Sequence, residues 1–186
     1  MPDGHRAALR AALLDYAARH GEEAGVAAAF RDFLATHPLA FERADSSGHF
    51  TGSAWLVDAR GERVLLTLHR KLGRWLQLGG HADGDADLAR VALREAEEES
   101  GLGGLVVEPV PFDLDRHRIP ARGDEPEHWH YDVRYVVRAT AGEDFVVSAE
   151  SRALAWRGVG ELAADAAADA SLRRMARKWI ARAAAR

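Results

Sequence analysis

The stretch GGHADGDADLARVALREAEEESGL, residues 79–102, decides how this chain is expected to fold. Its second half has the spacing of a helix, and four of the five positions from 95 to 99 are glutamates. At about 100° per residue, one side of that helix carries Leu88, Val91, Ala92, Glu95, Glu98, Glu99 and Leu102. Glu97 falls almost opposite Leu88. The side that begins apolar therefore becomes acidic, which directs three carboxylates toward the protein interior.

Three carboxylates on a core-facing side need compensation, because they repel one another and lose hydration. A hard divalent cation with oxygen ligands is the simplest compensation. Gly79 and Gly80 lie upstream and, lacking side chains, allow backbone carbonyls to approach the same site. Gly101 is suited to a left-handed cap that ends the helix. The stretch therefore predicts a metal site; the alternative is an ordinary salt-bridged surface helix.

Composition limits the class of protein. With 186 residues, of which 47% are hydrophobic, the chain can bury one sizeable core. The absence of cysteine excludes disulfides and zinc–thiolate sites, and the cytoplasm is the expected location. No apolar run is long enough to span a bilayer, so no membrane association is expected. A net charge of -4 argues against a sequence-independent nucleic-acid surface, which would be basic.

Hydrophobic periodicity predicts helices on both sides of a run of strands. Helices are predicted at 5–20, 23–36 and 169–184, in addition to the helix within 79–102. Strands are predicted at 50–58 and 63–70, joined as a hairpin across the turn at 59–61, and at 104–108, 111–119, 128–138 and 153–157. This order predicts one mixed α/β domain with an N-terminal helical extension.

In the quoted stretch the chain resembles the Nudix hydrolase family, whose box reads G-x5-E-x7-R-E-U-x-E-E-x-G-U with U aliphatic. The matching residues, all at the family's spacing, are Gly80, Arg94, Glu95, Ala96, Glu98, Glu99, Gly101 and Leu102. The flanking sequence HRKLGRWLQLGGHADGD is similar to a bacterial branch of the family. The resemblance implies a Nudix-like α/β/α sandwich with a mixed β-sheet and a C-terminal helix, residues 41–186, after an N-terminal helical extension, residues 1–40.

The resemblance also implies an activity, the hydrolysis of a pyrophosphate linkage assisted by Mg²⁺ or Mn²⁺. The substrate would be a nucleoside diphosphate linked to another moiety, such as a nucleotide sugar, an ADP-ribose-like compound, a dinucleotide or a nucleoside triphosphate. The implied metal ligands are Glu95, Glu98, Glu99 and Gly80, and the catalytic set includes Arg94, Glu98 and Glu99. The chemistry agrees, because metal ions bridge phosphate oxygens, stabilise developing charge and activate water.

A carboxylate must then accept the proton of the attacking water. By analogy with the family, this base lies either on the box helix or on a later loop. Glu150 is the candidate from the later loop, ahead of Glu143 and Asp144. The alternative for Glu150 is a solvated loop glutamate, because charged loop residues are normally exposed.

One position departs from the family pattern. The glutamate expected eight residues before Arg94 is Ala86 here, and in the family that glutamate usually braces the box arginine. Asp85 or Asp87 is expected to take over this contact. The departure affects the geometry around Arg94, whereas the metal ligands are retained.

Two polar strand faces are candidates for the wall of a substrate pocket. One carries His128, His130, Asp132 and Arg134, and the other carries Asp113, Asp115, His117 and Ile119. The alternative for both is a solvated sheet face. In the loop before the box, Lys71, Arg74, Trp75 and Gln77 are candidates for phosphate binding and base stacking, and His81 for pointing into the site. The alternative for Trp75 is a core anchor.

Three classes of function stay open. They are a metal-dependent pyrophosphohydrolase, a Nudix-like module that binds a nucleotide without hydrolysing it, and a protein-interaction domain. The retained acids favour the first. The expected partner is a small nucleoside diphosphate derivative; nucleic acid is not expected, and the sequence allows a homodimer.

Overall fold

The computed structural model describes residues 2–123, 126–149 and 151–185. Its helices are α1 (Pro2–Arg19), a 3-10 helix (Gly21–Glu23), α2 (Ala24–Thr36), α3 (Leu88–Ser100), α4 (Val159–Ala164) and α5 (Ala170–Ala184). Its strands are β1 (Gly48–Val57), β2 (Arg63–His69), β3 (Trp75–Leu76), β4 (Leu78–His81), β5 (Leu105–Ile119), β6 (His128–Ala139) and β7 (Ser151–Gly158). The predicted helices are confirmed, whereas the sequence pattern did not predict α4, β3 or β4. Within the described ranges, none of the helices combines the length and apolar character that crossing a membrane requires.

The strands form one sheet in the order β3-β2-β1-β6-β5. The sheet is mixed, as the sequence predicted. β1 and β6 run parallel from Gly48↔Trp129 to Val57↔Arg138. β5 is antiparallel to β6, and β4 is antiparallel to β1 from Thr51↔His81 to Ala54↔Leu78. The box entry, residues 78–81, therefore lies beside the strand that occupies the centre of the sheet.

The topology confirms the predicted hairpin next to its turn and corrects one other strand prediction. The expected hairpin of β1 and β2 is paired in register at Val57↔Val64, after which β2 runs along β7. The segments 104–108 and 111–119 belong to a single strand, β5, whose register is irregular between Val107 and Asp113. Pro111 lies at this irregularity, and a proline cannot donate to a β-ladder, so the sequence there resembles a strand break.

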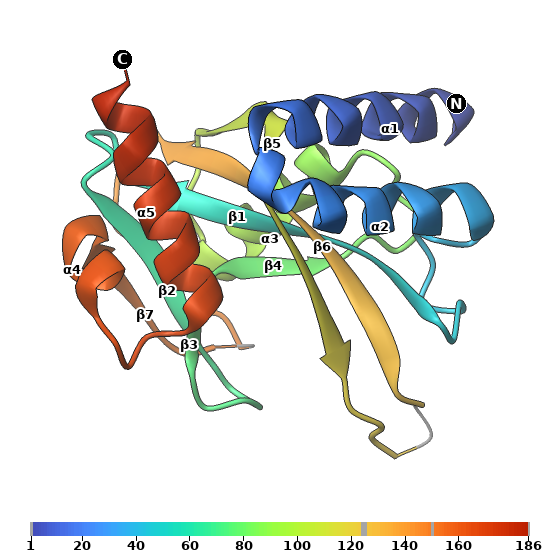
Figure 1. Ribbon diagram of the computed structural model, residues 1–186. Helices are drawn as coiled ribbons and strands as arrows, with labels where there is room; N and C mark the ends of the chain where they lie inside the picture. Colours follow the sequence, from blue (N-terminus) through green and yellow to red (C-terminus); the bar gives the residue numbers. More distant parts are fainter. Residues whose placement is uncertain (1, 124–125, 150, 186) are drawn as a thin grey trace.

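Helices cover both faces of the sheet, which confirms the predicted α/β/α arrangement (Figure 1). On one face, the side chains of β1 and β6 that include Phe50, Tyr131 and Val133 pack against α2 and α3. On the opposite face, Trp55 and Val136 pack against α4 and α5. Because both clusters are buried, the two faces of the central strands are fixed in register.

The N-terminal helices α1 and α2 lie side by side above the sheet (Figure 1). They share one core cluster with the sheet, since the Phe30 ring lies 5.2 Å from the Tyr131 ring and 6.0 Å from the Phe50 ring. Lys178 of α5 donates a hydrogen bond of 2.6 Å to the Tyr16 hydroxyl. The extension is therefore packed against the rest of the fold at both of its helices.

Gly52 of β1 allows α3 to approach the sheet. A Cβ at this position would lie 2.8 Å from the Leu88 carbonyl oxygen and 2.9 Å from Val91 Cγ1. We expect Gly52→Ala to lower the free energy of unfolding by about 1–3 kcal/mol, because the helix backbone must move. Urea denaturation measures this, with Gly142→Ala as the control since its Cβ would have no neighbour within 4 Å. Equal stability of the two variants would contradict this packing.

Candidate active site

A cleft of about 590 Å³ opens between the box helix, the box entry and the polar ends of the central strands. Many of the predicted site residues line it: Lys71, Gln77, Gly80, His81, Arg94, Glu95, Glu98, His117 and His130. Gly79 of the box entry and Ile119 and Asp132 of the two polar strand faces also line it, as expected. Residues that the prediction did not assign to the site line it as well: Arg43, Thr51, Ser53, His69, Leu72, Leu76 and Asp83. The sequence-based site is thus largely brought together in one place.

The box helix α3 has a defined start and end. The Asp87 carboxylate accepts a hydrogen bond of 3.1 Å from the Arg90 backbone N–H, which is an N-cap contact. Gly101 ends the helix with φ 68°, and its N–H donates to the Glu97 carbonyl, as expected for a left-handed glycine cap. These two ends fix the rotation of the helix and therefore the direction of its glutamates.

The three glutamates of the predicted metal site differ in their surroundings. Glu99 is buried, and its Oε1 accepts a hydrogen bond of 2.8 Å from the Gly79 N–H. Glu95 is half-buried beside Gly80, where a Cβ would overlap its carboxylate. Glu98 is exposed and faces the cleft. Of these three glutamates, Glu95 and Glu98 therefore line the cleft, while Glu99 braces the box entry.

Arg94 has partners other than those expected. Its Nη2 donates to the His81 carbonyl at 3.2 Å and to Glu95 Oε1 at 3.0 Å. Asp85 instead accepts two hydrogen bonds from Arg90, of 2.8 and 2.6 Å, while Asp87 caps the helix. In the described chain neither aspartate hydrogen-bonds Arg94, so the expected replacement for the missing brace is wrong. Arg90 lies one turn nearer the loop and reaches Asp85 first.

The polar faces of β5 and β6 adjoin in register, as required for a pocket wall, with Asp115 opposite Asp132 and His117 opposite His130. Asp132 is held by four donors: Thr51 Oγ1 at 2.9 Å, Ser53 Oγ at 2.7 Å, Arg134 Nε at 2.7 Å and Gln77 Nε2 at 3.3 Å. Its carboxylate therefore fixes the floor of the cleft and orients Gln77.

Asp115 and His128 do not line the cleft. Asp115 accepts hydrogen bonds from Arg174, at 2.7 Å, and from His117 Nδ1, at 3.1 Å. Burial raises the pKa of Asp115, but the hydrogen bond from His117 and the charges of Arg134 and Arg174 together bring it below its usual range. His128 is buried beside His130. Both residues support the wall of the cleft from behind.

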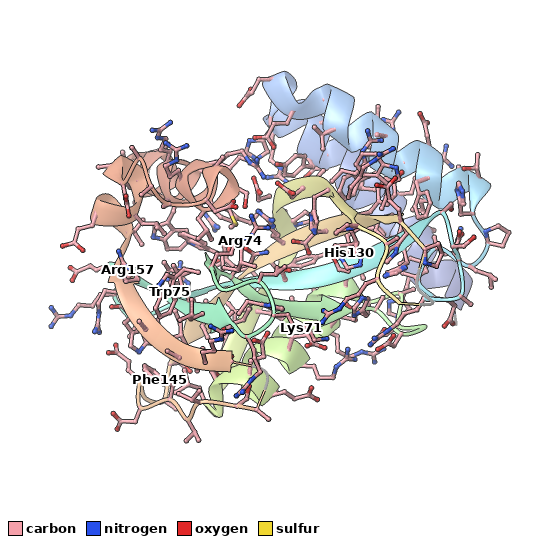
Figure 2. All side chains as sticks on the ribbon, turned by 90° about the horizontal axis from the view of Figure 1, so that it is seen from below. Lys71, Arg74, Trp75, His130, Phe145 and Arg157 are labelled. Atoms are coloured by element: carbon pink, nitrogen blue, oxygen red, sulfur yellow. The ribbon has the colours of Figure 1, made fainter. Side chains whose placement is uncertain are left out.

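Trp75 lies away from the cleft, in agreement with the core-anchor alternative. It packs against the cluster formed with α4 and α5, and with Arg74 and Arg157 it lines a separate pocket. Figure 2 shows Trp75 beside Arg74 and Arg157, whereas Lys71 lies on the side of His130. The residue of the loop that reaches the cleft with a positive charge is therefore Lys71.

The candidate general base, Glu150, lies outside the described residues. Of the two weaker candidates, Glu143 forms an ion pair with Arg63 and Asp144 is exposed on the following loop. Neither is among the residues of the described chain that line the cleft.

His49 was missed by the sequence analysis. It is a buried residue of β1 whose ring lies 4.8 Å from that of His130 and 5.0 Å from that of His81. Burial and the neighbouring histidines lower the pKa of His49 to about 4 and that of His130 to about 2. The signal was present in the sequence, since His49, Thr51 and Ser53 alternate along β1 and share the face of the cleft.

Comparisons with known proteins agree with this geometry. The family model described as the NUDIX domain matches residues 47–179. A search of curated proteins found no match. Among solved structures, the chain is similar to a hydrolase of the NUDIX family from Clostridium perfringens, with 26% identity, a TM-score of 0.55, and coverage of 70% of this chain and 95% of that one.

Two further solved structures share the fold. An Ap4A hydrolase binary complex from C. elegans has 18% identity and a TM-score of 0.58, with coverage of 74% of this chain and 98% of that one. The NUDIX domain of Shewanella oneidensis NrtR, in complex with ADP ribose, has 20% identity and a TM-score of 0.50, with coverage of 80% of this chain and 97% of that one.

Proposed function

Because this chain belongs to the NUDIX domain family, we propose that it hydrolyses the pyrophosphate linkage of a nucleoside diphosphate joined to another moiety, with Mg²⁺ or Mn²⁺ as cofactor. The observation that carries the proposal is the shared cleft, which holds box acids together with cationic and imidazole side chains. Clustered acids bind a divalent cation, and cationic groups bind phosphate. The cleft therefore offers binding groups both for the metal ion and for the phosphates of such a substrate.

The donor set fits a hard cation. Glu95 and Glu98 present carboxylate oxygens to the cleft, and Gly80 lies against Glu95, so its backbone carbonyl is the proposed third donor. Glu99 is the remaining ligand of the proposed set, and its contact with Gly79 N–H holds the box entry close to α3. When bound, the ion would neutralise phosphate charge and lower the pKa of a water molecule.

The remaining chemistry belongs to side chains. A water oxygen bonds to one phosphorus while the bridging P–O bond breaks, and a carboxylate takes the water's proton. We keep Glu150 as the proposed acceptor. Arg94 holds the Glu95 carboxylate and the His81 carbonyl, so its proposed role is to position the box. Lys71, Gln77, His81, His117 and His130 form the proposed substrate-binding wall.

The substrate can be identified with a panel of pyrophosphate compounds. Nucleotide sugars, ADP-ribose, Ap4A and nucleoside triphosphates are incubated with the metal-stripped protein, with and without Mg²⁺, and the products are separated by chromatography. Cleavage of at least one class only with metal supports the proposal. Binding of a compound without turnover would favour a non-catalytic nucleotide-binding module instead.

Metal binding also predicts a change in stability. An ion that binds only the native state at about 100 times its Kd stabilises it by about 2.7 kcal/mol, which corresponds to a rise in Tm of about 5–10 °C for a chain of this size. Differential scanning fluorimetry with Mg²⁺ or Mn²⁺ measures the rise, and Glu95→Gln should reduce it. An unchanged Tm of the wild type at saturating metal would contradict the proposed site.

A further inference from the structure

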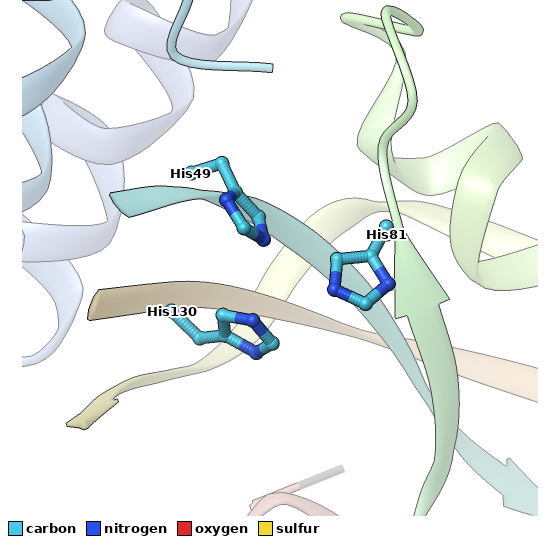
Figure 3. Close-up of side chains that lie close together, drawn as sticks. All are labelled: His49, His81 and His130. Carbon is cyan, nitrogen blue, oxygen red and sulfur yellow. The ribbon is translucent and has the colours of Figure 1, made fainter. Parts of the chain in front are cut away.

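Three strands bring three histidines together at one end of the cleft. His49 on β1 is the registered neighbour of His130 on β6, and His81 on β4 stands opposite Thr51, two residues along β1. One ring nitrogen from each lies within 4.8 Å of the nitrogens of the other two. Figure 3 shows the three rings turned toward one another from their separate strands.

His49 makes this cluster unusual. It is 2% exposed, and neither of its buried ring nitrogens has a hydrogen-bond partner among the residues that the structure describes. An unpaired buried polar group costs about 1–3 kcal/mol, so natural folds usually provide a partner for each one. The rings of His81, His128 and His130 surround it, at 4.8 to 5.0 Å between centroids. A partner that several of these imidazoles share would therefore satisfy His49.

His128 lies behind the three histidines, and its hydrogen bonds resemble those found around metal-bound histidines. His128 Nδ1 lies 2.9 Å from the Pro126 carbonyl, which can only accept, so Nδ1 carries the proton. In the neutral ring the His128 Nε2 then presents a lone pair, 3.3 Å from His130 Nε2. His130 Nε2–H can then donate to His128, which leaves the Nδ1 lone pair of His130 as its metal-binding atom; such a contact of the other ring N–H fixes the tautomer of a ligating imidazole.

We propose that His49, His81 and His130 bind a divalent first-row transition-metal ion, with Zn²⁺ as the best match, at a site separate from the box acids. Imidazole nitrogen suits Zn²⁺, Co²⁺ or Ni²⁺, whereas Mg²⁺ selects oxygen. Three protein ligands leave a fourth position, as in catalytic zinc sites. Since His81 and His130 line the cleft, that position faces the cleft and is open to water or to a phosphate oxygen.

The geometry requires only a small adjustment. Ligand nitrogens about 2.0–2.1 Å from a tetrahedral Zn²⁺ are about 3.3 Å apart. Rotation of the half-buried His81 and His130 side chains would close the present separations of up to 4.8 Å. The backbone of His81 is held in place, because its carbonyl accepts a hydrogen bond from Arg94 and the residue lies in the β1–β4 ladder.

The test is metal binding by the untagged, chelator-treated protein in an excess of Mg²⁺. We expect calorimetry to detect one Zn²⁺ per chain, and Co²⁺ to give the visible absorption of a tetrahedral site. His49→Phe keeps a ring in the same space and should abolish both signals. His5→Phe is the control, because His5 is an exposed histidine on α1 and should leave binding unchanged. Glu98→Gln should also retain Zn²⁺, which separates this site from the box.

His81→Ala serves as a second variant where His49→Phe fails to fold, because His81 lies at the cleft wall and its truncation leaves no closed void. It should weaken Zn²⁺ binding by more than about 100-fold, because the loss of even an outer partner of a metal ligand costs about 10–100-fold. Absence of Zn²⁺ binding by the wild type would overturn the proposal. So would binding that survives in both histidine variants but disappears in Glu98→Gln, or a wild-type cluster that binds inorganic phosphate in place of Zn²⁺. Because no substrate is used, these outcomes are independent of whether the proposed hydrolysis occurs.

Discussion

Glu98→Gln should lower kcat by about 100-fold or more on a verified substrate, with little change in Tm. The amide keeps the shape of the side chain but removes the charge that would hold the cation in the cleft. Glu98 is exposed, and its side chain makes no hydrogen bond with another of the described residues. Its substitution should therefore affect the reaction without affecting folding. Steady-state kinetics at saturating Mg²⁺, together with thermal unfolding, measures both quantities.

Glu97→Gln is the matched control. Glu97 is the neighbouring residue on the same helix and is also exposed, but it does not line the cleft. The two variants change the net charge equally, so a general electrostatic effect would lower both rates alike. Wild-type kcat in Glu98→Gln, or the same loss in both variants, would contradict the assignment of Glu98 to the reaction.

Asp113→Asn should lower the free energy of unfolding by about 3–5 kcal/mol, which corresponds to a fall in Tm of about 6–20 °C. Asp113 is fully buried and accepts hydrogen bonds from Arg134 at 3.3 Å, Arg174 at 2.7 Å and Lys178 at 2.7 Å. A neutral amide cannot balance these cations, and Arg134 is itself 3% exposed. Three elements, β5, β6 and α5, would lose a shared contact.

The control for this prediction is Asp15→Asn. Asp15 pairs with Arg19 at 3.2 Å on the surface of α1, where an ion pair contributes about 0–1 kcal/mol. Denaturant unfolding of both variants compares a buried with an exposed loss of the same charge. A Tm for Asp113→Asn within a degree or so of the Asp15→Asn value would contradict the structural role of this buried network.

The features that the sequence predicted are those with strong local signals. The helical period, the Gly101 cap and the box spacing placed α3 and its acids, and the family and the α/β/α fold inferred from the sequence are confirmed. The alternation in 128–138 predicted which residues of β6 share a face, and the register of β5 then joined the two polar faces as expected.

The features that it did not predict depend on tertiary partners. Several acceptors lie near Arg94 in the sequence, and the His81 carbonyl becomes its acceptor only because β4 approaches α3 in the fold. Alternation along β1 puts His49 on the face of Thr51 and Ser53, but its place beside His130 follows only from the parallel pairing of β1 with β6. Trp75 reads equally as an anchor or a stacking surface until α4 and α5 are placed on their face of the sheet.

The division of the chain into an extension, residues 1–40, and a domain, residues 41–186, remains our proposal. The family model begins at residue 47, after α2. The ring contact of 4.0 Å between Phe33 and Tyr131 nevertheless shows that α2 completes the core over β6. The extension therefore differs from a separate domain, since its apolar side is occupied by the sheet.

The most direct test of the central claim is product analysis of a cleaved pyrophosphate compound in water labelled with ¹⁸O. Mass spectrometry of an incubation with Mg²⁺ should show two phosphate-containing products with one ¹⁸O atom on a phosphate group of one of them, and none without metal. For ADP-ribose these products would be AMP and ribose phosphate. Failure to cleave any compound of the panel, cleavage independent of metal, or ¹⁸O found only on a sugar carbon would contradict metal-dependent hydrolysis of a pyrophosphate linkage in this cleft.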